Sequence, residues 1–198
     1  MVQLKIIKYC ELNNVQKEEV IEIFLEGFGH FMTFSKDKEE LKRLLLSAMN
    51  PEYTLACVEE DKVLGIIGIA TNRIRPIKFE KSVCVELFGR WKGIILCKEM
   101  NLIFQSKVVK KDTDLYIDFL TTAKNARGKG IATLLINYSF HLPGYKEYYI
   151  EVLSENVNAK RLYEKMNFVA YKKCPHSFIA RMGYGYPIKM KRTTNEVR

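Results

Sequence analysis

The sequence has few of the residues that build disulfide frameworks or metal centres. Its five cysteines are odd in number and contain no C-x-x-C pair, and only three histidines accompany them. A scattered, odd set of cysteines predicts neither a disulfide framework nor a zinc site. We therefore expect no metal site, and we interpret the cysteines as buried apolar residues.

Long apolar runs are also missing. Residues 1–11 lack the apolar core of a signal peptide. The most apolar later stretch, Gly93–Phe104, contains Lys98 and Glu99 and is too short to span a bilayer. We expect a cytoplasmic protein with no membrane partner.

What is present is enough for one globular domain with a basic surface. The chain has 198 residues and is 47% hydrophobic, which predicts a single domain over residues 1–198 with an inserted or extended segment at about 74–111. The net charge of +9 favours an anionic ligand. No compact Lys/Arg run with interleaved aromatic residues is present, so nucleic acid is an unlikely partner. The oligomeric state does not follow from these features.

The stretch Leu115–Ala132 combines a strand, a glycine-rich turn and a helix start. Apolar and aromatic residues predict a strand at Leu115–Leu120, and apolar residues at helical spacing predict a helix at Ile131–Phe140. Between them, Arg127–Gly130 supplies two glycines and two cations. Free N–H groups and the helix dipole favour an anion at such a helix start. The stretch therefore predicts a phosphate or pyrophosphate site.

The glycine turn alone leaves other interpretations open. It does not fit a P-loop, and Thr133 stands where a dinucleotide-binding motif needs its third glycine. Glu151 follows at about the distance of the acidic residue in that motif, so a dinucleotide-binding oxidoreductase stays an alternative. A plain helix start is another.

A second motif follows the predicted strand Tyr148–Leu153 and lies on a predicted helix, Asn156–Met166. Residues 127–132, RGKGIA, and the pattern N-x-x-A-x-x-L-Y-E-K-x-x-F of residues 156–168 together resemble the GNAT superfamily of N-acetyltransferases. Two positions depart from it. Lys124 replaces a frequent proline, and Asn167 replaces the usual glycine, although asparagine tolerates a left-handed backbone.

The resemblance implies an α/β fold: a three-layer α/β/α sandwich around a mixed, mostly antiparallel sheet with a central, splayed pair of parallel strands. A strand, crossover helix, strand order independently predicts that the two strands around the glycine turn are parallel. Other strands are expected at 2–9, 53–58, 63–70, 168–173 and 186–191, and helices at 15–26 and 36–49. Ser35 is the expected cap of the second helix, Gly65 and Gly68 suggest a bulge or a close approach, and residues 175–185 are expected to form a loop.

The resemblance also implies acetyl-CoA as acyl donor. Backbone groups of Leu120, Thr121 and Thr122 are expected to meet the acetyl group and the pantetheine. The pyrophosphate site is expected at Arg127, Gly128, Lys129, Gly130, Ile131, Ala132 and Thr133. Asn156 is expected to contact the pantetheine arm, with a plain helix cap as the alternative.

Two residues are candidates for moving protons. Tyr163 matches the tyrosine that in this family protonates the leaving thiolate, and a core tyrosine is the alternative. Strand alternation places Tyr116, Asp118 and Leu120 on one face, where Asp118 is the candidate base, directly or through water. An ion pair with a nearby Lys or Arg is the alternative for Asp118, and Asp114 is the reserve candidate.

Residues 74–111 carry no readable motif. Their apolar residues predict one or two amphipathic helices packed on the sheet as ordinary core, with a substrate lid as the alternative. The expected function is transfer of an acetyl group from acetyl-CoA to a primary amine by direct attack. A non-catalytic CoA-binding regulatory domain is the alternative. The acceptor, a small-molecule or peptide amine, is not defined by the sequence.

Overall fold

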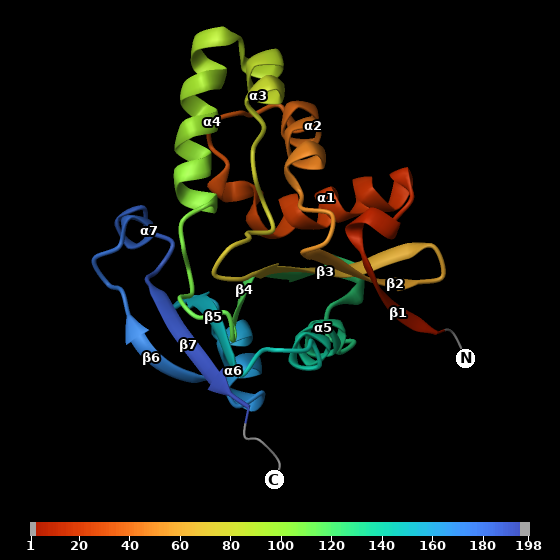
Figure 1. Ribbon diagram of the computed structural model, residues 1–198, viewed down its shortest axis with the longest axis vertical. Coiled ribbons are helices and arrows are strands. Elements are labelled where there is room, and N and C mark those ends of the chain that lie inside the picture. The colour runs from red at the N-terminus through yellow and green to blue at the C-terminus, as the bar shows by residue number, and fades with distance from the viewer. Residues whose placement is uncertain (1–2, 195–198) are drawn as a thin grey trace.

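A computed structural model describes residues 3–194 of the chain (Figure 1). Residues 1–2 and 195–198 of the predicted domain, with the start of the predicted first strand, lie outside that part. The described strands form one seven-stranded sheet in the order β1-β2-β3-β4-β5-β7-β6. The strands are β1 (Leu4–Lys8), β2 (Thr54–Glu59), β3 (Lys62–Ala70), β4 (Asp114–Thr122), β5 (Glu147–Leu153), β6 (Val169–Lys173) and β7 (Pro187–Thr193). The α-helices are α1 (Asn14–Phe28), α2 (Lys38–Ala48), α3 (Lys81–Phe88), α4 (Arg90–Phe104), α5 (Ile131–Phe140), α6 (Val157–Lys165) and α7 (Phe178–Arg181).

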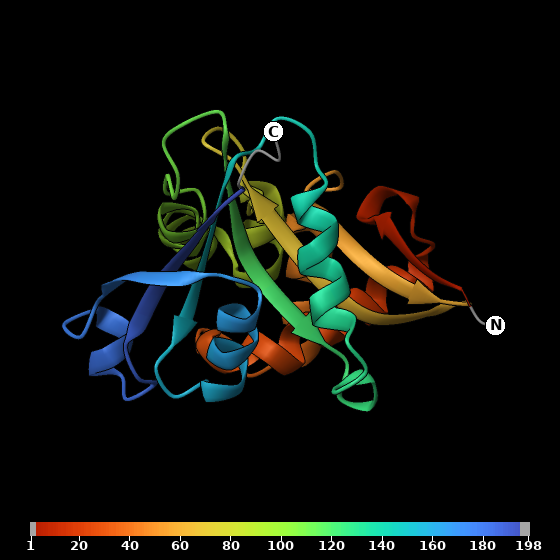
Figure 2. The same ribbon diagram turned by 90° about the horizontal axis from the view of Figure 1, so that it is seen from below.

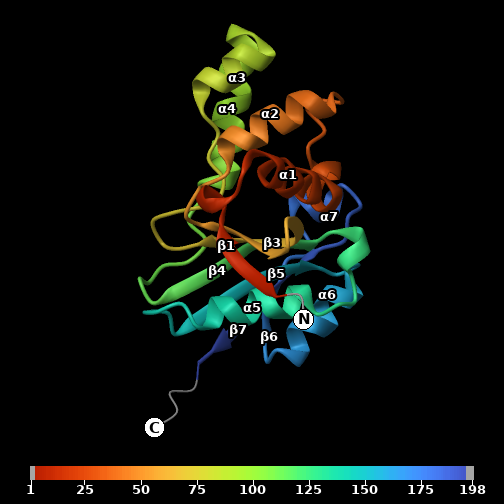
Figure 3. The ribbon, with the colours of Figure 1, turned by 90° about the vertical axis from the view of Figure 1, so that its right-hand side faces the viewer.

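The helices cover the sheet from both sides, which confirms the predicted three-layer α/β/α sandwich (Figure 3). Helices α1 to α4 lie on one side, and α5 and α6 lie on the other. One buried apolar cluster joins α1 and α2 to the sheet, and a second joins α5 and α6 to the opposite face. The predicted helix at 131–140 is confirmed as α5.

The central strands β4 and β5 are parallel, as predicted, and they separate after a short paired region. Their pairing runs from Asp114–Glu147 to Ile117–Ile150. Beyond that point β4 continues to Thr122 and β5 to Leu153 without pairing to each other. Figure 2 shows the two strands diverging from a common start.

A β-bulge sits where the central strands begin to separate. Gly68 of β3 pairs with Phe119, but its neighbour Ile69 pairs with Ile117, so Asp118 is an extra residue in β4. An extra residue of this kind reverses the alternation of the side chains that follow it. The prediction that Leu120 shares a face with Asp118 is therefore wrong: Leu120 packs against the α5 side, whereas Phe119 joins the core under α1.

The segment 74–111 forms two helices, but the prediction that it packs on the sheet as ordinary core is wrong. Helices α3 and α4 make a hairpin that stands off the sheet beyond α2 (Figure 1). Its inner face buries Cys84 and Cys97. Its outer face leaves Trp91 77% exposed and Leu102 78% exposed.

Two shorter elements also differ from the sequence-based expectations. Helix α2 begins at Lys38 because the Asp37 carboxylate accepts hydrogen bonds from the N–H groups of Glu39 and Glu40, so Asp37 and not Ser35 is the cap. The predicted loop at 175–185 contains the short helix α7, which Ser177 caps.

Candidate functional site

The glycine turn before α5 has the geometry of an anion site. Gly128 (φ 77°) and Gly130 (φ 80°) both have left-handed backbones, which glycine adopts without steric cost. A Cβ on either residue would meet no other atom within 4 Å, so the space above the turn is open. The first helical hydrogen bond runs from the N–H of Leu134 to the carbonyl of Gly130. The N–H groups of residues 131–133 therefore have no partner within the helix and remain available to an anion.

The unpaired stretch of β4 leads directly into this turn. Between Asp118 and Thr122, β3 pairs with one edge of β4, while the edge that faces β5 has no strand partner. Backbone groups of Leu120, Thr121 and Thr122 along this edge are therefore available to a ligand. The structure thus places the expected acyl-binding segment and the expected pyrophosphate turn in one continuous stretch.

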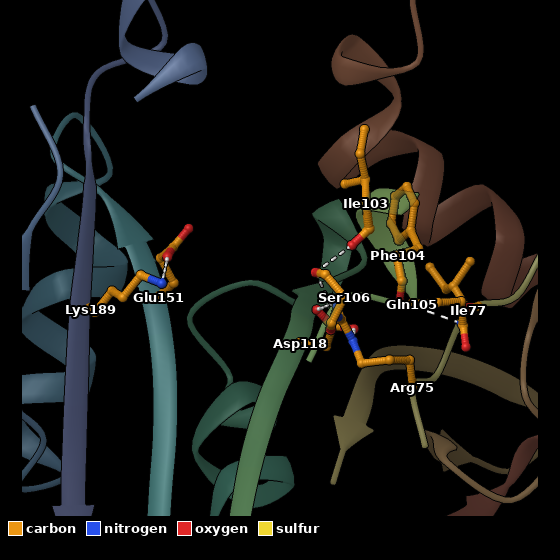
Figure 4. A network of polar contacts seen from close by, with 9 residues as sticks. All are labelled: Arg75, Ile77, Ile103, Phe104, Gln105, Ser106, Asp118, Glu151 and Lys189. Carbon is orange, nitrogen blue, oxygen red and sulfur yellow. Dashed lines mark hydrogen bonds and ion pairs between the residues drawn. The ribbon is translucent and has the colours of Figure 1, made fainter. Parts of the chain in front are cut away.

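Two carboxylates flank the opening between the strands. Asp118 and Glu151 are each the first residue after the last paired residues, Ile117 and Ile150. Figure 4 shows them on opposite sides of the gap, Asp118 on β4 and Glu151 on β5. Glu151 could not be placed here from the sequence, because its position depends on the register of β4 and β5.

Asp118 is held in the ion pair that the sequence analysis left as its alternative role. Its two carboxylate oxygens accept hydrogen bonds from Arg75 at 3.0 and 2.9 Å. Arg75 also donates to the backbone carbonyl of Ser106, just after α4 (Figure 4). Burial raises the pKa of Asp118, and Arg75 opposes that rise. Sequence analysis missed Arg75, which lies in a loop far from Asp118 along the chain.

Glu151 is less tightly held than Asp118. Its only ion-pair partner among the described residues is Lys189 of β7, with a distance of 3.7 Å between Nζ and Oε2. Its side chain is 28% exposed. Burial raises the pKa of Glu151 above its ordinary value, and Lys189 lowers it in part. A half-buried carboxylate with a raised pKa and a loose partner is suited to accept a proton.

Tyr163 lies on α6 within the apolar core on the α5 side of the sheet. It is 6% exposed, and its ring lies 6.1 Å from that of Phe168. Burial raises the pKa of Tyr163, which keeps its hydroxyl protonated. Within residues 3–194 that hydroxyl has no hydrogen-bond partner, so its proton is not committed to the protein.

Asn156 and Asn167 delimit the same helix. The Asn156 side-chain oxygen accepts a hydrogen bond from the N–H of Ala159 at 3.2 Å, so this residue caps α6. Asn167 has a left-handed backbone (φ 64°), as its place in the motif allows.

Asp114, the reserve candidate base, is buried at the start of β4 and accepts a hydrogen bond from the N–H of Lys111, away from the opening.

These residues fit coenzyme A. The free backbone N–H groups of the glycine turn suit its pyrophosphate, and the unpaired edge of β4 suits the amide-rich pantetheine arm.

Within the described residues, no helix combines the length and the apolar character needed to cross a membrane.

Comparison with known proteins identifies the class to which this fold and site belong. The family model for the acetyltransferase (GNAT) family matches residues 17–168. This match spans more than half of the chain, so the chain belongs to the acetyltransferase (GNAT) family. It is an N-acetyltransferase, and its acyl donor is acetyl-CoA. A search of curated proteins found no match.

Solved structures share the fold at low sequence identity. An N-acetyltransferase from Staphylococcus aureus Mu50 has a TM-score of 0.63 and 15% identity, covering 95% of this chain and 100% of that one. Ard1 from Thermoplasma volcanium has a TM-score of 0.58 and 16% identity, covering 98% of this chain and 100% of that one. NAA60 from Arabidopsis thaliana, solved with acetyl-CoA, has a TM-score of 0.53 and 16% identity, covering 97% of this chain and 100% of that one.

Proposed function

We propose that this enzyme transfers the acetyl group to a primary amine by direct attack, with Glu151 accepting the amine proton and Tyr163 protonating the leaving sulfur. The observation that carries the proposal is the unequal state of the two carboxylates at the opening. Asp118 is bound twice by Arg75, whereas Glu151 has one partner at 3.7 Å. A proton acceptor needs a free lone pair, which favours Glu151 over Asp118.

Residues along one path would hold the coenzyme. Arg127, Lys129 and the N–H groups at the start of α5 would bind the pyrophosphate. The free edge of β4 at 120–122 would bind the pantetheine and the acetyl carbonyl. Asn156 uses its side-chain oxygen as a helix cap, which leaves its amide nitrogen available to the pantetheine arm. When bound, acetyl-CoA supplies a thioester carbonyl that an amine can attack.

The protein then moves two protons. The Glu151 carboxylate takes a proton from the acceptor's ammonium group, and its raised pKa makes it a stronger base than an exposed glutamate. The Tyr163 hydroxyl gives a proton to the leaving sulfur. The raised pKa of Tyr163 ensures that this proton is present at neutral pH.

The acceptor is proposed only as a class, a small-molecule or peptide amine. One structural neighbour, the NatC complex, was solved with Gag peptide and CoA, which is consistent with a peptide acceptor in this fold. A cytoplasmic location remains part of the proposal. A non-catalytic CoA-binding domain is less well supported, because such a domain has no need of a loosely held carboxylate at the opening.

The test begins with calorimetric titration of the protein with acetyl-CoA, with NADH as the control ligand. Release of free thiol is then measured with a panel of small amines and peptides, for the parent protein and for Glu151→Gln. We expect acetyl-CoA but not NADH to bind, and amine-dependent thiol release to be lost in Glu151→Gln. Tight acetyl-CoA binding without thiol release from any amine would support the regulatory alternative.

A further inference from the structure

Lys189 places an amine of the protein itself beside a carboxylate that borders the opening between the central strands. It lies on β7 directly opposite Glu151 in the β5–β7 pairing, and the two side chains share one face of the sheet. Its Nζ is 3.7 Å from the Glu151 carboxylate (Figure 4). The side chain is 42% exposed, so its long stem keeps conformational freedom.

A second pair on the same strands shows what is particular to this position. Lys191, two residues along β7, lies 4.0 Å from Glu147 and is similarly exposed, at 46%. Glu147 pairs with Asp114, at the closed start of the β4–β5 ladder. Glu151 instead follows the last pair, where the strands have separated. Lys191 lies opposite Tyr149 in the pairing, and Glu147 also accepts hydrogen bonds from Tyr149 and Thr193, so Lys191 is a control of similar exposure and carboxylate distance away from the opening.

We infer that Lys189 is an intramolecular acetyl acceptor, modified by the protein's own active site when no external amine is present. This inference rests on the proposed function. The geometry that would orient an external ammonium group toward Glu151 already orients the Lys189 ammonium group toward the same carboxylate. The site thus holds an example of the chemical group on which it is proposed to act.

The step balances without a further reactant. Glu151 takes one proton from the Lys189 ammonium group, and the freed Nζ lone pair forms a bond to the thioester carbonyl carbon. The nitrogen then loses its second proton to water, the carbon–sulfur bond breaks, and the sulfur takes the Tyr163 proton. Glu151 then releases its proton to water and Tyr163 regains one from water. The products are Nε-acetyl-lysine at 189, the free thiol of coenzyme A and one proton.

Acetylation at this position would change the site itself. It would remove the positive charge beside Glu151 and place an acetamide at the opening. External amines would then meet a narrower entrance and a carboxylate without its cation. We therefore expect the acetylated protein to turn over external amines more slowly than the unmodified protein.

The experiment follows the intact mass of the purified protein during incubation with acetyl-CoA alone, with peptide mapping of each lysine. Parent, Lys189→Arg, Lys191→Arg and Tyr163→Phe proteins are compared, with heat-denatured protein as the control for uncatalysed acetylation. We expect one rapid acetylation at Lys189, about 10²-fold faster than at Lys191, in keeping with the contribution of a general base. Lys191→Arg should keep this rapid phase, whereas Lys189→Arg and Tyr163→Phe should lose it.

Separate measurements distinguish failure of this inference from failure of the proposed function. Each variant is titrated with acetyl-CoA by calorimetry and assayed for thiol release with external amines. Equal acetylation rates at Lys189 and Lys191, or no acetylation while external amines are acetylated, would overturn the inference alone. Absence of thiol release under all conditions, despite acetyl-CoA binding, would overturn the proposed function as well.

Discussion

At the scale of single residues, burial has a different consequence for each of the two groups that are proposed to move protons. Burial raises the pKa of both Glu151 and Tyr163. For the glutamate, a higher pKa means a stronger base. For the tyrosine, it means a proton that stays in place until a basic sulfur draws it away. One physical effect therefore favours the proposed role of each group, the base and the acid.

Replacing Tyr163 with phenylalanine tests the acid directly. Tyr163→Phe keeps the ring that packs near Phe168 and removes only the hydroxyl. We expect the turnover number to fall about 10²-fold, the lower end of a general acid's contribution. The acetyl-CoA dissociation constant, measured by calorimetry, should change little. Unchanged turnover would remove Tyr163 from the mechanism and leave it as a core residue.

The dependence of activity on pH tests Glu151. The base works when deprotonated, so kcat/KM should rise with pH through the pKa of Glu151, at a higher pH than an ordinary glutamate would give. Lys189 lowers this pKa, so Lys189→Met should move the acid limb further up in pH. Other groups near Glu151 are Asp118, Tyr116 and Tyr171. Lys191→Met is the matched control, and an acid limb that moves equally in both variants would count against Glu151.

At the scale of elements, local patterns fix each helix and strand, whereas the register between strands decides which side chains meet. The bounds of α5 and the cap of α6 follow from residues close together in sequence, and the structure confirms both. The bulge at Asp118 depends on how β4 aligns with β3, some fifty residues earlier in the chain. For that reason simple alternation failed at Leu120. Glu151 could not be identified as a site residue either, because its place depends on where the pairing of β4 with β5 ends.

The glycine turn offers a prediction about one element. Gly130→Ala puts a Cβ on a left-handed residue (φ 80°), which costs roughly 1–2 kcal/mol. If the turn relaxes, the N–H groups at the start of α5 no longer converge, so acetyl-CoA should bind about tenfold or more weakly. Gly144→Ala is the matched control, because Gly144 has φ 89° and the same open surroundings but lies in the loop after α5. Calorimetry and thermal unfolding of both variants separate binding from stability.

If Gly130→Ala and Gly144→Ala lose the same stability and both keep full acetyl-CoA affinity, the turn is an ordinary helix start. That result would return the glycine motif to the plain interpretation that the sequence alone left open. Loss of affinity in Gly130→Ala alone would assign the pyrophosphate to this turn.

At the scale of the whole molecule, the α3–α4 hairpin is tied to the centre of the sheet through one buried arginine. Arg75, between β3 and α3, binds Asp118 at the bulge and Ser106 after α4. The hairpin's outer face is exposed, whereas its inner face packs against α2. Helical periodicity predicted its helices, but not that they stand off the sheet. That arrangement depends on contacts with α2 and on the ion pair, and both are distant in sequence.

The Arg75–Asp118 pair gives a prediction that also decides the role of Asp118. Both side chains are nearly buried, at 9% and 12% exposure. Removing one partner of a buried pair leaves the other charge uncompensated, so Asp118→Asn should lower the free energy of unfolding by about 3–5 kcal/mol. The double variant Arg75→Met/Asp118→Leu leaves no buried charge and should recover much of that loss. Denaturant unfolding measures both, and Trp91, the single tryptophan, reports on the hairpin by fluorescence.

Activity of the same double variant separates the two possible roles of Asp118. If Asp118 serves the fold and Glu151 accepts the proton, the refolded double variant should keep amine-dependent thiol release within about tenfold of the parent, because Glu151 and Tyr163 are unchanged. If Asp118 is the base, the double variant should lose about 10²-fold or more, however stable it is. If the ion pair only positions the opening, activity should be lost and recovered together with stability. If the carboxylate of Asp118 itself takes the proton, the double variant should recover stability but not activity.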